Sequence, residues 1–188
     1  MLITTTQNLT FEEYLTYDDD TDTRYELVEG QLIPMTPPIL QHYLIARFLM
    51  LMFESAIKRA NLPYLTLLEA GQRTGIRNSR LPDLLVIPIT VIEELRFQPA
   101  IFESAALLAV EVVSPSSVED DYISKRDEYQ AIGIPEYWVV DAISENPRIT
   151  IHTLTDDVYH PNIFSNAELL ISPTFLELQV TAEQILNA

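Results

Sequence analysis

The sequence predicts an α/β sandwich, in which helices cover both faces of a mixed β-sheet. Helical and strand patterns are interspersed along the chain, which favours a sheet packed against helices. Two segments are almost continuously apolar, as expected for strands that are covered on both faces. The chain has 188 residues, of which 47% are hydrophobic, so it can bury the core of one domain. We divide this domain into an N-terminal helix and hairpin (about 10–36), a core (about 38–155) and a C-terminal extension (about 156–188).

Local signals define the elements of the N-terminal third. Thr10 precedes the segment FEEYLTY and suits the N-cap of a short helix. The segment RYELVEGQLIPM predicts a β-hairpin, because Gly30 lies between two apolar stretches and can adopt a positive φ. Pro37 and Pro38 then open a long helix, from about 39 to 60. One stripe of this helix carries Leu44, Phe48, Leu51 and Ser55, and a wetter side carries Arg47, Glu54 and Lys58.

Strand patterns dominate the rest of the chain. We expect strands at 64–69, 83–87, 107–113, 136–140 and 148–154, with a turn inside 71–80. A helix over 118–132 follows the third of these strands and ends at Gly133. The C-terminal part is expected to hold a short strand near 175–180 and a helix capped by Thr181.

Net charge and cysteine content exclude several function classes. The chain has 11 Lys and Arg against 28 Asp and Glu, and its formal net charge of −17 argues against a general nucleic-acid binder with a broad basic surface. The absence of cysteine excludes disulfides, thiolate metal sites and thiol nucleophiles. The first ten residues lack the pattern of a secretory signal, and no segment suits an unbroken membrane span. We therefore expect a cytoplasmic protein with no membrane partner.

Two acidic residues stand in strands that are otherwise apolar. Asp83 opens the strand DLLVI, and Glu111 lies between valines in LLAVEVV. A buried carboxylate is unfavourable unless it is paired or binds a metal. One such acid would most simply pair with an arginine, but two at matching ends of neighbouring strands favour a site for Mg²⁺ or Mn²⁺. In the following helix Asp121, Lys125 and Tyr129 share one face, either as a surface ion pair or with Lys125 directed toward the carboxylates.

Together these residues resemble the PD-(D/E)xK nuclease superfamily, and most closely a branch of endonucleases of unknown target that is common in photosynthetic bacteria. The landmarks are YELVEG (25–30), His42, Pro82-Asp83, VEVVSP (110–115), Asp121, Lys125, Tyr129, Gly133 and EYW (136–138). The resemblance covers residues from about 11 to 154 and, more weakly, the rest of the chain. It implies a restriction-endonuclease-like three-layer sandwich and a metal-dependent endonuclease.

The catalytic lysine departs from the superfamily pattern. The pattern places lysine two residues after the glutamate, where this chain has Val113. In the branch that this chain resembles, the lysine has moved to the following helix, which implies Asp83, Glu111 and Lys125 as catalytic residues. The metal ligands that the resemblance implies are Asp83, Glu111, the Val112 carbonyl and Glu26. We do not expect His42 to be catalytic, because a histidine on a helix is more often a satisfied polar residue than a ligand.

Basic residues gather directly before Asp83. The segment 70–82 contains Arg73, Arg77 and Arg80 and no acid, and arginine suits bidentate phosphate contacts. Two interpretations stay open: these arginines hold a substrate phosphate, or they solubilise a loop or pair with acids of a partner subunit. The leading hypothesis is a Mg²⁺- or Mn²⁺-dependent endonuclease that cleaves DNA and forms a homodimer. The alternatives are a catalytically inactive scaffold or regulatory protein of the same fold, and RNA or a small phosphodiester as substrate.

Overall fold

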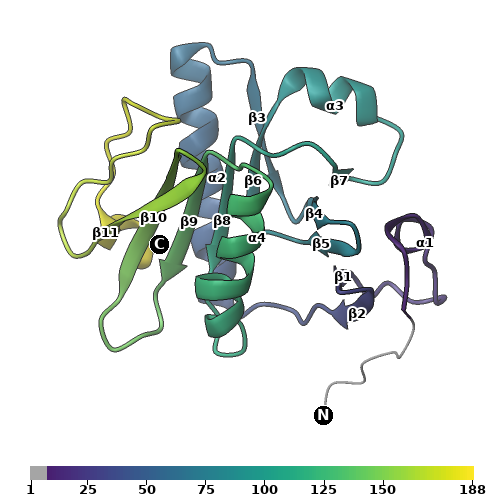
Figure 1. Ribbon diagram of the computed structural model, residues 1–188. Helices are drawn as coiled ribbons and strands as arrows, with labels where there is room; N and C mark the ends of the chain where they lie inside the picture. Colours follow the sequence, from purple (N-terminus) through teal and green to yellow (C-terminus); the bar gives the residue numbers. More distant parts are fainter. Residues whose placement is uncertain (1–7) are drawn as a thin grey trace.

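The computed structural model describes residues 8–188, and its central layer is a six-stranded mixed sheet (Figure 1). The strand order is β11-β10-β9-β8-β6-β3, in which β8 and β9 are parallel and all other neighbours are antiparallel. The strands are β3 (Tyr64–Leu68), β6 (Leu84–Pro88), β8 (Leu108–Val112), β9 (Glu136–Asp141), β10 (Arg148–Thr155) and β11 (Val158–Phe164). The predicted mixed sheet is thus confirmed. Because β11 belongs to this sheet, residues 158–164 of the expected C-terminal extension are part of the core.

A second sheet lies beside the central one and was not predicted. Its five strands have the order β2-β1-β5-β4-β7. They are β1 (Tyr25–Val28), β2 (Gln31–Pro34), β4 (Gly71–Gly75), β5 (Asn78–Arg80) and β7 (Ile101–Phe102). The hairpin expected at Gly30 is confirmed: Glu29 and Gly30 have φ values of 49° and 81°. The turn expected inside 71–80 joins β4 and β5, which pair with each other as a hairpin. The other neighbour of β5 is β1, far away in the sequence, and this pairing was not predicted.

Helices cover both faces of the central sheet, as expected for the sandwich. The helices are α1 (Phe11–Leu15), α2 (Leu40–Ala60), α3 (Ile89–Leu95), α4 (Lys125–Ala131) and α5 (Ala182–Leu186), and a π-helical turn (Asp120–Ser124) leads into α4. Thr10 and Thr181 cap α1 and α5 through capping boxes, as predicted. The strand expected near 175–180 is wrong: this segment forms no regular strand, and its neighbourhood contributes a single bridge between Leu169 and Thr181.

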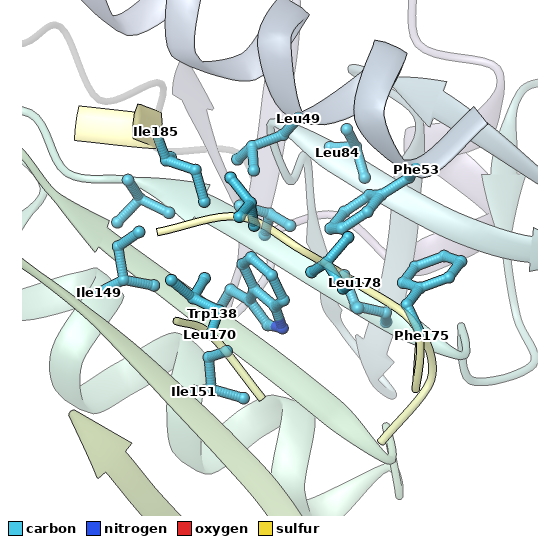
Figure 2. Close-up of a cluster of buried hydrophobic side chains, with 14 of the residues drawn as sticks. Leu49, Phe53, Leu84, Trp138, Ile149, Ile151, Leu170, Phe175, Leu178 and Ile185 are labelled. Atoms are coloured by element: carbon cyan, nitrogen blue, oxygen red, sulfur yellow. The ribbon is translucent and has the colours of Figure 1, made fainter. Parts of the chain in front are cut away.

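Alternating side chains of the central strands belong to two hydrophobic layers, one on each face of the sheet. Leu84 and Val86 face α2 and α5, whereas Leu85 and Ile87 face the opposite layer, which includes Tyr129 of α4. Figure 2 shows the first layer, where the C-terminal segment crosses the sheet and its side chains pack against those of α2. The aromatic rings at its centre belong to Phe53, Trp138 and Phe175, with centroid distances of 5.3 Å for Phe53–Trp138 and 4.7 Å for Phe53–Phe175.

The stripe of α2 expected from the sequence is not the buried one. Ile45, Leu49 and Phe53 are completely buried, whereas Leu44 and Leu51 are 38% and 48% exposed. Apolar residues occur on both sides of this helix, so periodicity alone could not select the side that faces the sheet.

Among residues 8–188, no helix combines the length and the apolar character that a membrane span requires. The expectation that the chain has no secretory signal falls mainly on residues 1–7, which lie outside the described residues.

Candidate active site

Asp83 and Glu111 meet at one end of the antiparallel pair β6–β8. Leu84 pairs with Val110, so the next residues outward, Asp83 and Glu111, lie opposite each other. Asp83 Oδ2 accepts a hydrogen bond from the Val112 N–H at 2.7 Å. The Asp83 side chain is 23% exposed and that of Glu111 is 4% exposed. Solvent therefore reaches the pair mainly from the side of Asp83.

Lys125 points toward the carboxylates. Its Nζ lies 2.8 Å from Glu111 Oε2, 2.9 Å from Asp121 Oδ1 and 3.9 Å from Glu26 Oε1. The Tyr129 hydroxyl, one turn further along α4, donates to Glu111 Oε1 at 2.8 Å. Since the Lys125 side chain is 7% exposed, the interpretation as a surface ion pair is wrong. The helical spacing of these residues instead brings them onto one buried face.

Asp121 is held in place from both ends. Its Oδ2 accepts a hydrogen bond from the Ser117 hydroxyl at 2.5 Å, and its backbone carbonyl accepts one from Tyr137 at 2.7 Å. The π-helical turn that contains Asp121 directly precedes Lys125, and such turns are frequent at functional sites.

The electrostatic environment contains more negative than positive charge. Burial raises the pKa of the Glu111 carboxyl well above its ordinary value, against the attraction of Lys125. The charges of Asp121, Asp83 and Glu26 add to this rise. Burial alone would lower the pKa of Lys125, but the surrounding carboxylates raise it well above its ordinary value, so the amine stays protonated at neutral pH. The unbalanced negative charge would attract a further cation.

The oxygen donors of this site suit a small, hard cation. Asp83 and Glu111 offer carboxylate oxygens from adjacent strands, and Mg²⁺ is usually held by one or two carboxylates with several waters retained. Within residues 8–188, no three His, Asp or Glu side chains gather in an arrangement that could hold a metal by themselves. A cation here would therefore need water, a backbone carbonyl or substrate oxygens to complete its coordination.

Glu26 reaches the site from the second sheet. Its Oε1 accepts a hydrogen bond from the Leu81 N–H at 3.0 Å, and its Oε2 accepts one from Arg80 Nη1 at 3.0 Å. Its side chain is 6% exposed. Glu26 thus lies near Lys125, with both of its carboxylate oxygens already accepting hydrogen bonds.

The three arginines before Asp83 do not form a shared basic surface. The Arg80 side chain is 3% exposed and paired with Glu26 and Glu128, so its expected contact with a substrate phosphate is wrong. Arg73 lies 2.6 Å from Glu103 and stacks over Phe11, and Arg77 Nε donates to the Leu9 carbonyl at 3.0 Å. Arg73 pairs with Ser79 across the hairpin β4–β5, so Arg80, the next residue of β5, points to the opposite face, and Arg77 lies in the turn between the two strands. A phosphate contact by Arg73 or Arg77 stays a prediction.

His42, which is not expected to be catalytic, nevertheless lies at the site. Its Nε2 lies 2.7 Å from Asp83 Oδ1, and its side chain is 12% exposed. The only sequence feature that could have indicated this contact is the position of His42 in the first turn of a long helix. The sequence does not show that this turn lies beside the start of β6, where Asp83 is found.

Comparison with known proteins agrees with this fold. The fold and the family match place the chain in the restriction-endonuclease-like class of nuclease-like proteins. The chain matches the model of the Uma2 family, described as "Putative restriction endonuclease", over residues 11–183, and belongs to that family. It is similar to the crystal structure of "a putative nuclease belonging to DUF820" from Anabaena variabilis. The two chains are 21% identical, the TM-score is 0.78, and the match covers 95% of this chain and 98% of the other. No curated protein matches the chain.

Proposed function

We propose that the chain is a Mg²⁺- or Mn²⁺-dependent endonuclease that hydrolyses phosphodiester bonds of DNA. The observation that carries the proposal is the contact of Lys125 with Glu111 at 2.8 Å, directly beside Asp83 on the neighbouring strand. This arrangement supplies two carboxylates for a cation and one protonated amine next to it. Membership of a family described as restriction endonucleases supports a nuclease reaction.

Each residue has a role that follows from its contacts. Asp83 and Glu111, with the Val112 carbonyl and Glu26 as further candidates, would hold Mg²⁺. The metal would supply a Lewis acid for the phosphoryl oxygen and a water of lowered pKa. Lys125 carries a fixed positive charge, which stabilises negative charge developing on the phosphate and orients the attacking water. His42 contacts the more exposed carboxylate, Asp83, and fixes its orientation.

An inactive scaffold of the same fold is the second candidate, and one observation favours it. Both carboxylate oxygens of Glu111 already accept hydrogen bonds, from Lys125 and Tyr129, so this buried acid is satisfied without a metal. Calorimetric titration with Mn²⁺ separates the two candidates. The endonuclease binds Mn²⁺, whereas no binding at millimolar metal would favour the scaffold.

The endonuclease proposal is tested by cleavage of plasmid DNA with Mg²⁺, with Mn²⁺ and with EDTA. Wild type is compared with Asp83→Ala, Glu111→Ala and Lys125→Ala, and with Glu69→Gln as a control at an exposed ion pair. We expect metal-dependent cleavage that the three site variants lose and the control keeps. Cleavage that survives all three changes would refute the proposal. Parallel assays with single-stranded DNA, RNA and bis(p-nitrophenyl) phosphate identify the substrate class.

We also propose that the enzyme acts as a homodimer. Two copies would offer one site to each strand of a DNA duplex, and two-fold dimers are the commonest protein assemblies. Sedimentation equilibrium should give twice the chain mass at assay concentrations, and a monomer that cleaves both strands would overturn this part of the proposal.

A further inference from the structure

Arg80 links the second sheet to helix α4 through buried contacts that the proposed reaction does not use. Its Nε and Nη2 donate to the two carboxylate oxygens of Glu128 at 2.9 and 2.5 Å. Its Nη1 donates to Glu26 Oε2 at 3.0 Å. Glu128 also accepts a hydrogen bond from the Thr74 hydroxyl at 2.6 Å. One side chain of β5 thus holds one carboxylate of α4 and another of β1.

Both carboxylates bear on the position of Lys125, Glu128 through the helix that they share and Glu26 by proximity to its amine. Glu128 is three residues after Lys125 on α4, so a bidentate contact with Glu128 restricts rotation of the helix that carries Lys125. The second carboxylate oxygen of Glu26, Oε1, lies 3.9 Å from Lys125 Nζ. Arg80 therefore fixes the helix from which Lys125 extends and also one of the carboxylates that it faces.

We propose that Arg80 is a positioning residue, which clamps Glu128 and Glu26 so that Lys125 Nζ is held against Glu111. This inference rests on the proposed function and assigns Arg80 a role other than phosphate binding. Arginine suits the task because its planar guanidinium presents N–H groups in fixed, divergent directions, whereas lysine presents a single point charge. The contacts also join the second sheet to helix α4, because Arg80 and Glu26 belong to β5 and β1 and Glu128 belongs to α4.

A purely stabilising role of the clamp makes a different prediction. Breaking a buried ion pair is strongly destabilising wherever it lies, so loss of stability alone does not identify positioning. A positioning role lowers the turnover of the folded enzyme, since small displacements of a reacting group can reduce a rate about 10²-fold. A phosphate-binding role would instead raise KM.

The test compares Arg80→Lys, Glu128→Gln and the control Arg24→Gln, which removes the exposed pair with Glu69. The kcat and KM for DNA cleavage are measured at a temperature at which circular dichroism shows each variant folded. We expect kcat to fall about 10²-fold in Arg80→Lys. The decrease should be smaller in Glu128→Gln, because Arg80 keeps its contact with Glu26 in that variant. The KM of both variants, and the kcat and KM of the control, should stay within twofold of wild type. Glu128→Gln decides the test if Arg80→Lys does not fold.

The outcomes separate the clamp from the proposed function. Unchanged kcat with lowered stability makes Arg80 merely structural, and raised KM with unchanged kcat makes it a substrate contact; both overturn the inference. A wild type without nuclease activity refutes the proposed function, and the crystal structure of Glu128→Gln then decides on the clamp. The inference expects Lys125 Nζ to shift away from Glu111 in that structure, and an unchanged contact would overturn it.

Discussion

Replacement of Lys125 by methionine removes the positive charge from a site that is rich in carboxylates and leaves the length of the side chain nearly unchanged. In the wild type, Nζ lies 2.8 Å from Glu111 and 2.9 Å from Asp121, and all three side chains are at most 7% exposed. Removal of one partner from a buried ion pair costs about 3–5 kcal/mol, because the remaining charge has no partner. We expect a loss of this size in the free energy of unfolding at pH 8.

The same substitution should be less harmful at low pH. Burial already raises the pKa of Glu111 and of Asp121, and loss of Lys125 removes the attraction that opposes this rise. A carboxyl whose folded-state pKa lies above its unfolded value makes the folded protein less stable as pH rises through that folded pKa. The destabilisation of Lys125→Met relative to wild type should therefore be larger at pH 8 than at pH 5.

Urea unfolding at pH 5 and pH 8 measures this difference, and cleavage of plasmid DNA with Mn²⁺ measures the catalytic loss. We expect the rate to fall about 10²–10³-fold, the effect of removing one group that stabilises transition-state charge. Binding of Mn²⁺ should persist, because Asp83 and Glu111 remain. Wild-type stability of the variant at pH 8 would refute the buried contact, and wild-type cleavage would refute the catalytic role.

Three further predictions concern stability. Tyr129→Phe removes the buried hydrogen bond to Glu111 and should lower the unfolding free energy by about 1–2 kcal/mol, measured by urea unfolding; an unchanged value would contradict the bond. His152 stacks on Tyr137, and burial lowers its pKa to about 4, so between pH 6.5 and 4 the unfolded chain binds a proton that the folded one does not. The unfolding free energy of the wild type should therefore fall as pH falls through this window. The variant His152→Phe should lose roughly 2 kcal/mol less over the same range, a figure discounted for partial solvent screening. Thermal melts that give wild type and variant the same pH profile would contradict a buried, neutral His152. Thr181→Ala deletes the cap of α5 and should cost about 1 kcal/mol in thermal unfolding, whereas an unshifted melting temperature would show that the cap contributes nothing.

The convergence of Asp83, Glu111 and Lys125 could be predicted because it depends on short-range rules. Strand register places Asp83 opposite Glu111, and helical spacing places Asp121 and Lys125 on one face. Each of these rules acts within one element or between neighbouring strands. The residue types then indicate the chemistry, because a carboxylate in an apolar strand needs a partner.

The remaining features depend on contacts between distant segments. The second sheet forms because β5 pairs with β1, and short polar strands such as 78–80 show no period-2 pattern. The second sheet brings Arg80 to Glu26 and Glu128, so one arginine of the apparent basic cluster is buried in ion pairs. The sequence alone does not show these partners. Strand β11 was missed because it is an edge strand with Pro161 in its middle, which argues against a strand in the sequence alone.

The proposed reaction requires that Asp83 and Glu111 hold a divalent cation beside Lys125. Crystals soaked in Mn²⁺ and measured near the manganese absorption edge show whether they do. We expect an anomalous peak between the carboxylates of Asp83 and Glu111, with Lys125 Nζ beside the water shell of the metal. The absence of a peak at this position at millimolar Mn²⁺, or a peak bound by other residues, would refute metal binding by Asp83 and Glu111.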